Sequence, residues 1–169
     1  LRGAAAGRHA GTTPRSRAGR DIAVNGEVQW LEPEWPAPPG VRVISTLRQG
    51  GSSGGPYASM NLAGHVGDVA ASVEANRRLL RRAAHLPAEP MWLEQVHGTE
   101  VVIHDGRSDV PRADAALTRG RGRVCAALTA DCLPVVLADR AGSRVAVAHA
   151  GWRGLAQGVV EATVRALHC

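Results

Sequence analysis

Three residues with metal-binding side chains lie at the ends of apparent strands: His97, Cys132 and His149. Each follows or sits within a short apolar run and precedes a turn former or a helix. Two imidazoles and one thiolate are a ligand set for a tetrahedral metal whose fourth position stays free for water or substrate. The separations of 35 and 17 residues are too wide for a zinc knuckle. The residue types therefore indicate an enzymatic metal centre, whereas the spacing alone does not establish one.

The same three residues also fit roles without a metal. A histidine at a strand end is often a hydrogen-bonded structural group, and a cysteine in an apolar segment is often a small buried side chain. Cys132 would alternatively be a nucleophile with His149 or His97 as its base, which would make the chain a thiol hydrolase. A third alternative is an inactive fragment in which Gly151–Gly154 and an upstream glycine loop serve only a partner interface.

Hydrophobic periodicity predicts the elements that would position these side chains. A first helix is expected over Val69–Leu86, with Asp68 as its N-cap, and a second helix begins after Gly151. The closely spaced segments Leu133–Ala138 and Arg144–Ala148 predict an antiparallel hairpin. Further strands are expected over Glu27–Leu31, Val41–Leu47, Met91–Val96, Glu100–His104 and Arg123–Ala130. Several strands with few helices predict a mixed α/β or α+β layered fold.

Composition limits the class of protein. The chain has 169 residues, of which 44% are hydrophobic, enough for one domain with a core. Residues 1–20 carry five arginines and no acid, so the net charge of +5 belongs to this stretch and the remainder is neutral. We expect a disordered leader over residues 1–21 and a single catalytic domain over 22–169. Neither nucleic-acid binding nor a membrane span is predicted. Three cysteines favour a reducing, cytoplasmic compartment.

Four motifs occur in a fixed order: Gln95-Val-His-Gly, Ala113-Asp-Ala, Thr129-Ala-Asp-Cys-Leu-Pro and His149-Ala-Gly-Trp-Arg-Gly. Together they resemble the YfiH-type family, labelled multicopper polyphenol oxidase or laccase domain and more recently understood as purine nucleoside phosphorylases. The Arg-containing run from Thr46 to Leu62, then Gly67-Asp68 and Asn76-Arg77, are also similar to this family. The resemblance covers residues 41–167.

The resemblance implies a four-layer α/β/β/α sandwich with mixed sheets and a zinc ion held by His97, Cys132 and His149. It implies phosphorolysis of adenosine, inosine, guanosine or methylthioadenosine, with reported adenosine deaminase activity. Arg48 matches the arginine of the family's first loop and is expected to bind phosphate or substrate, with Asn61 as a nearby candidate. Family members continue past the His-Ala-Gly-Trp helix, so we expect this sandwich to lack its C-terminal part.

Deamination requires a general acid or base near the metal. Asp131, beside Cys132, and Glu94, near His97, are the nearest candidates, and Asp131 is our choice.

The older family label implies copper-dependent oxidation of phenols. A cluster of several copper ions needs many histidine ligands. This chain has seven, including His9 in the leader and His168 near the end. A single copper with Met60 or Met91 as axial ligand remains an alternative. The sequence does not predict an oligomeric state.

Overall fold

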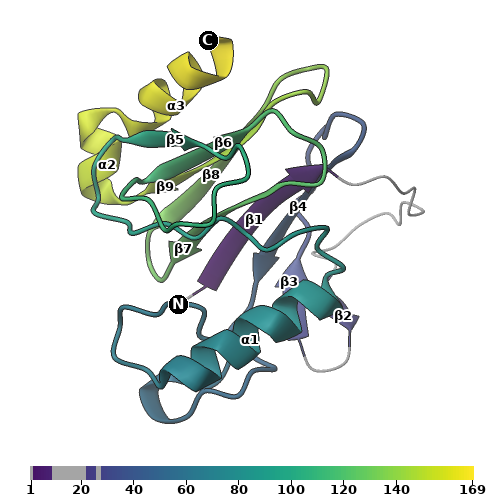
Figure 1. The fold of residues 1–169 in the computed structure, drawn as a ribbon, viewed down its shortest axis with the longest axis vertical. Helices are drawn as coiled ribbons and strands as arrows, with labels where there is room; N and C mark the ends of the chain where they lie inside the picture. The colour runs from purple at the N-terminus through teal and green to yellow at the C-terminus, as the bar shows by residue number, and fades with distance from the viewer. Residues whose placement is uncertain (1, 9–21, 26–27) are drawn as a thin grey trace.

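A computed structural model describes residues 2–8, 22–25 and 28–169, which form two stacked β-sheets between two layers of helix (Figure 1). The larger sheet is antiparallel throughout, in the order β2-β3-β4-β1-β7. Its strands are β1 (Arg2–Arg8), β2 (Ile22–Asn25), β3 (Val28–Leu31), β4 (Val41–Thr46) and β7 (Val124–Thr129). The smaller sheet has the order β5-β6-β9-β8 and is mixed, because β5 and β6 are parallel. Its strands are β5 (Val101–Ile103), β6 (Ala115–Thr118), β8 (Leu133–Ala138) and β9 (Val145–Ala150).

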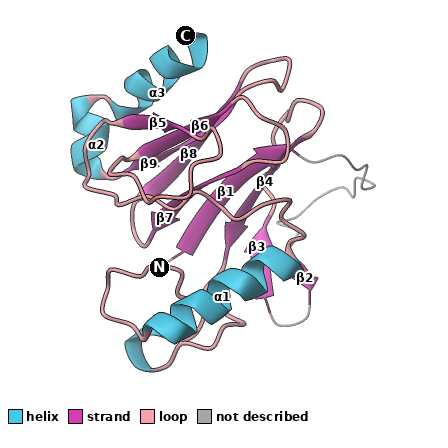
Figure 2. Ribbon diagram, viewed as in Figure 1, coloured by secondary structure: helices cyan, strands magenta, loops and turns pink. Residues whose placement is uncertain are grey.

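The helices lie on the outer faces of the two sheets (Figure 2). Helix α1 (Ala70–Ala83) packs on the larger sheet through Leu80 and Ala83. Helices α2 (Trp152–Gln157) and α3 (Val159–His168) lie on the side of the smaller sheet, where Val159 packs against Ala115 and Ala148. A short 3₁₀ helix, η1 (Gly55–Tyr57), interrupts the loop between β4 and α1. The four-layer α/β/β/α order expected from the resemblance is confirmed.

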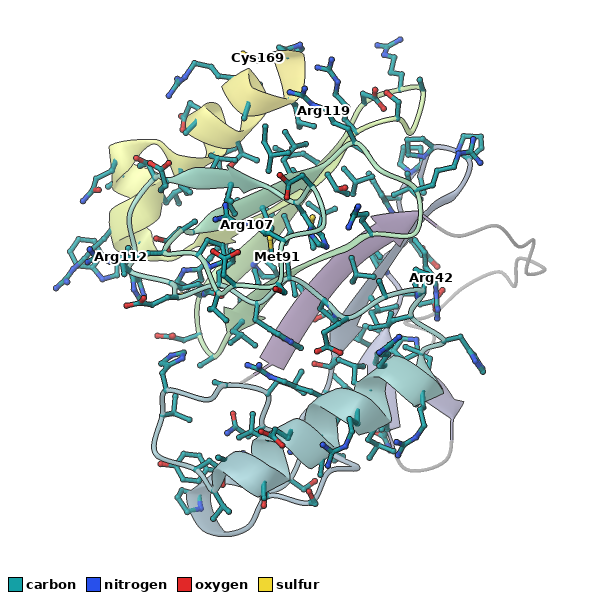
Figure 3. The ribbon with its side chains drawn as sticks, in the orientation of Figure 1. Arg42, Met91, Arg107, Arg112, Arg119 and Cys169 are labelled. Carbon is teal, nitrogen blue, oxygen red and sulfur yellow. The ribbon has the colours of Figure 1, made fainter. Side chains whose placement is uncertain are left out.

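Strand β7 shows how the alternation of side chains builds both cores. Val124, Ala126 and Leu128 face the core shared with α1, whereas Cys125 and Ala127 face the core between the sheets. Met91 packs in this second core, and Figure 3 places it between the two sheets. Successive strand residues point to opposite faces, so a strand buried on both faces reads as a continuous apolar run.

Several predicted elements are present with nearly the expected bounds. Segments predicted over Glu27–Leu31, Val41–Leu47, Glu100–His104 and Arg123–Ala130 contain β3, β4, β5 and β7. The predicted hairpin is formed by β8 and β9, whose register runs from Leu133 opposite Ala150 to Ala138 opposite Val145.

The predicted strand over Met91–Val96 is wrong, because this segment forms only isolated bridges at Met91 and Glu94. It alternates like a strand, since Met91 and Leu93 face the core between the sheets and Trp92 faces the core of α1. Regular pairing ends at Gln95, whose side-chain amide donates to the carbonyl of Leu128 and accepts from its N–H, at 2.8 and 2.7 Å. The Gln95 side chain thus makes the two hydrogen bonds to β7 that backbone groups would make in a longer strand.

Residues 2–8 correct the expectation of a disordered leader. They form β1, which lies between β4 and β7. The glycine and alanine run of β1 shows no hydrophobic alternation, so the sequence does not predict a strand there. Its small side chains nevertheless fit the crowded position between β4 and β7. A Cβ at Gly3 would lie 2.9 Å from the side chain of Leu62, and Ala4 is buried between the sheets. The rest of the expected leader, residues 9–21, lies outside the described residues, and the single domain over 22–169 stays a prediction.

Both helix boundaries also differ from expectation. The N-cap of α1 is Val69 rather than Asp68, although Asp68 accepts a hydrogen bond from the N–H of Val69. The predicted second helix is two helices, α2 and α3, because Gly158 adopts a left-handed conformation with φ of 94°. Glycine takes this conformation without a steric cost. Within the described part of the chain, no helix combines the length and apolar character that crossing a bilayer requires.

Candidate metal centre

The structure brings His97, Cys132 and His149 together at one end of the sheets. Their donor atoms all lie within 4.8 Å of one another, and Nε2 of His97 is 3.8 Å from Sγ of Cys132. The two imidazole rings meet edge to face, with centroids 4.7 Å apart. His149 is buried, Cys132 is partly buried and His97 is exposed, so the group is open to solvent on one side.

Each side chain reaches this point from a different element. His149 lies near the end of β9, Cys132 lies in the turn between β7 and β8, and His97 lies in the loop that follows Gln95. Pro134 on β8 lies opposite His149 on β9. This register places the Cys132 turn beside the end of β9. The hairpin predicted from the sequence is therefore what brings cysteine and histidine together.

The space among the donors tests whether they fit a metal. For zinc with ligands at about 2.1 and 2.3 Å, tetrahedral nitrogen and sulfur donors lie about 3.6 Å apart, close to the 3.8 Å found here. A Cβ at Gly151 would lie 2.7 Å from Cδ2 of His97 and 3.0 Å from Sγ of Cys132. Since Gly151 has an ordinary backbone conformation, with φ of −67°, its missing side chain keeps this space open. The donor set and the space both fit a metal ion.

The electrostatic surroundings of Cys132 do not activate a free thiol. Burial raises the pKa of the Cys132 thiol, and the carboxylates of Asp131 and Asp114 raise this pKa further. Reactive cysteines have a lowered pKa, because a nearby cation or helix N-terminus stabilises the thiolate. The surroundings of Cys132 therefore favour the protonated thiol, and a bound cation would be needed to stabilise the thiolate.

The two acid/base candidates, Asp131 and Glu94, are both exposed. Asp131 is exposed, and its Oδ1 lies 3.8 Å from Sγ of Cys132. Glu94 is also exposed, and neither carboxylate belongs to the group formed by His97, Cys132 and His149. The choice of Asp131 as the acid/base group stays a prediction.

Arg48 and Asn61 line one cavity of about 240 Å³, together with Ala130. Ala130 comes two residues before Cys132, so this cavity adjoins the turn that holds the cysteine. The Nε and Nη2 atoms of Arg48 donate to the carbonyl of Ala58, at 2.9 and 2.6 Å. Asn61 is buried, and its amide bonds to Ala63 and to Asp68. Both residues are therefore held in place beside the cavity, and their role in binding substrate stays a prediction.

Two further observations bear on the site. A larger cavity of about 600 Å³ lies among β3, β4 and β8 and contains none of the predicted site residues. The candidate copper ligands Met60 and Met91 are buried in separate apolar clusters.

Sequence reasoning assigned no role to Asp114, although it is the residue that contacts both histidines. Its Oδ1 lies 2.9 Å from Nδ1 of His149 and 2.9 Å from the N–H nitrogen of His97. The available signal was an acid between two alanines, Ala113 and Ala115, since a carboxylate enclosed by small apolar residues needs several partners.

Comparisons with known proteins agree with the motifs. Residues 42–169 match the family described as multi-copper polyphenol oxidoreductase laccase. A Pseudomonas aeruginosa protein named purine nucleoside phosphorylase is 54% identical over 138 residues, covering 82% of this chain and 56% of that protein. The Escherichia coli purine nucleoside phosphorylase YfiH is 53% identical over 135 residues, with 79% and 56% covered. This chain thus spans little more than half the length of the curated relatives it matches.

Solved structures show the same architecture. A Neisseria meningitidis protein of the DUF152 family superposes with a TM-score of 0.77 at 44% identity, covering 83% of this chain and 57% of that one. YlmD from Geobacillus stearothermophilus superposes with a TM-score of 0.75 at 32% identity, covering 85% and 57%.

Proposed function

This chain belongs to the family described as multi-copper polyphenol oxidoreductase laccase, and we propose that it is part of a zinc-dependent purine nucleoside phosphorylase. The substrates would be phosphate and adenosine, inosine, guanosine or methylthioadenosine, with adenosine deamination as a second activity. The observation that carries the proposal is the convergence of His97, Cys132 and His149 within 4.8 Å. The names of the relatives at 53–54% identity supply the reaction class.

The centre would act on the leaving group. In phosphorolysis a phosphate oxygen attacks the C1′ carbon of the sugar, the glycosidic bond breaks, and its electron pair passes to the purine. Zinc, when bound, would supply positive charge that stabilises the departing base. His97 and His149 would hold the ion through ring nitrogens and Cys132 through its thiolate, which leaves one position for substrate.

Arg48 would bind the phosphate nucleophile. Its guanidinium is planar and permanently charged, and such a group recognises phosphate through paired N–H donors. The hydrogen bonds to Ala58 fix the side chain at the edge of the 240 Å³ cavity that adjoins the Cys132 turn. Asn61 would act from the wall of the same cavity.

Asp131 would serve the deamination reaction. An exposed carboxylate 3.8 Å from the sulfur of Cys132 is close enough to exchange a proton with a water or amino group near the centre. We place the enzyme in the cytoplasm, since Cys125, Cys132 and Cys169 are all unpaired.

Two other functions have less support. A multicopper oxidase needs further histidine-rich sites, whereas the described residues contain one group that fits a metal. A thiol hydrolase needs an activated cysteine, whereas the surroundings of Cys132 raise its pKa.

One incubation distinguishes these functions. Purified protein is loaded with zinc or with copper, supplied with adenosine and phosphate, and its products are separated by chromatography. Adenine and ribose-1-phosphate with the zinc form support the phosphorylase, and inosine supports the deaminase. Metal-loaded protein that yields neither product, or oxidation of a phenol by the copper form alone, would contradict the proposal for this chain.

A further inference from the structure

Asp114 is a fully buried acid that contacts two of the three residues at the centre. It directly precedes β6, in the middle of the smaller sheet, and its backbone carbonyl accepts the N–H of His149 at 2.7 Å. Its side chain lies 2.9 Å from Nδ1 of the same histidine. Backbone and side chain of one residue therefore fix both the main chain and the ring of His149.

The same carboxylate also holds the loop of His97. It accepts hydrogen bonds from three consecutive N–H groups, those of Val96, His97 and Gly98, at 3.2, 2.9 and 2.7 Å. His97 has a left-handed conformation with φ of 61°, which a non-glycine residue seldom adopts. Successive N–H groups arranged in this way form a concave anion-binding nest. The anion in this nest is Asp114 itself, so the loop conformation that presents His97 depends on this carboxylate.

These bonds also determine which nitrogen of His149 faces the centre. Each oxygen of Asp114 accepts at least one backbone N–H, so a carboxyl proton would oppose a donor at either position. A carboxylate only accepts hydrogen bonds, and Nδ1 of His149 must therefore carry its proton. The proton-free Nε2 then remains as the metal-binding atom.

We propose that Asp114 is the positioning residue of the metal centre: one buried carboxylate sets the tautomer and orientation of His149 and the loop conformation of His97. The proposal rests on the proposed function only for the presence of a metal. Together with the thiolate of Cys132, Asp114 would supply two negative charges close to a divalent cation, and a carboxylate bonded to a ligating histidine fixes the orientation of its ring.

The test compares Asp114→Asn with wild type in the 169-residue chain. The asparagine amide has the shape of the carboxylate. Its NH₂ group, however, would face a backbone N–H that donates to a carboxylate oxygen in wild type. The dissociation constant for zinc is measured by competition with a chromophoric chelator, and we expect it to rise about 10- to 100-fold.

Thr118→Val is the matched control. Thr118 is also fully buried on β6, where its hydroxyl donates to the carbonyl of His104 and accepts from the N–H of Gly120. Its loss is expected to lower the melting temperature and to leave zinc affinity unchanged. A melting temperature measured for both variants separates lost stability from lost positioning.

A second readout needs no variant. In metal-free wild type, nitrogen-15 NMR of the histidine rings is expected to place the proton of His149 on Nδ1. A proton on Nε2, or an Asp114→Asn variant that binds zinc as tightly as wild type, would overturn the inference about Asp114. The proposed metal centre would stand in that case, because wild type would still bind zinc. A wild-type chain that binds no zinc would overturn both the metal centre and this inference. Zinc affinity and the NMR assignment are both measured without enzymatic turnover.

Discussion

Sγ of Cys132 lies 3.8 Å from Nε2 of His97, although the two residues are 35 positions apart in the chain. Gln95 makes this approach possible, because its amide pairs with both backbone groups of Leu128 and so attaches the His97 loop to β7. Strand β7 ends at Thr129, three residues before Cys132. The turn with the cysteine and the loop with the histidine therefore start from neighbouring points on one strand.

Gly151→Ala is expected to weaken zinc binding by about tenfold or more, a loss of about 1.4 kcal/mol. The added methyl group would meet His97 and Cys132 at 2.7 and 3.0 Å and would have to displace one of them. Gly64→Ala is the control, because a Cβ there meets nothing within 4 Å. Chelator competition measures both variants, and equal affinities would show that the space beside Gly151 is not needed.

Zinc is expected to protect Cys132 from iodoacetamide, with at least about a tenfold lower rate of alkylation, since a metal-bound sulfur is a poor nucleophile. The other cysteines are internal controls. Cys169 is exposed at the end of α3 (Figure 3), and should react equally with and without zinc. Cys125 is buried, which raises its pKa to about 12, and should not react. Peptide mass spectrometry gives the alkylation rates of the three cysteines. An alkylation rate of Cys132 that is the same with and without zinc would favour the alternative in which Cys132 is a free nucleophile.

Arg48→Ala is expected to raise the Kd for phosphate about 10- to 150-fold, since losing hydrogen bonds to a charged group costs about 1.5–3 kcal/mol. Isothermal titration calorimetry measures this without turnover. Arg78→Ala is the control, because Arg78 pairs with Glu74 on the exposed face of α1. If both variants bind phosphate like wild type, Arg48 is not the phosphate ligand.

The protein is expected to lose stability as the pH falls below about 6.5, the ordinary pKa of histidine. His104 is buried, and neither of its ring nitrogens has a hydrogen-bond partner among the described residues. Burial lowers its pKa, and the charge of Arg123 lowers this pKa further. The unfolded chain therefore binds a proton at higher pH than the folded chain does, and acid favours unfolding.

His104→Leu removes this proton-binding group and should flatten the dependence of unfolding free energy on pH below about 6.5, the ordinary pKa of histidine. His65→Gln is the control, since His65 is exposed. Urea unfolding at several pH values checks both, and a slope unchanged by His104→Leu would contradict the assignment.

Residue types indicated a metal-binding group and the family resemblance supplied its ligand set, whereas the supporting structure was only partly predictable. Two histidines and one cysteine, each at the end of a predicted strand, favour a metal site over their other roles without any knowledge of the fold. The hairpin of β8 and β9 was also predictable, because a short polar turn separates two apolar runs.

Small residues account for much of what could not be predicted. Strand β6 is four buried residues within a polar, glycine-rich stretch, and β1 is mostly glycine and alanine. Neither shows an apolar alternation, because tight packing between two sheets selects size rather than hydrophobicity. The role of Asp114 was hidden for another reason: three of the four hydrogen bonds of its carboxylate come from backbone N–H groups, which every sequence contains.

Cobalt titration of the metal-free chain tests the central claim most directly, because a thiolate bound to cobalt absorbs light through charge transfer. We expect saturation at one equivalent with such a band, its loss in Cys132→Ser, and an unchanged band in Cys125→Ser and Cys169→Ser. No saturable binding, or the same band in Cys132→Ser, would contradict a metal centre formed by His97, Cys132 and His149.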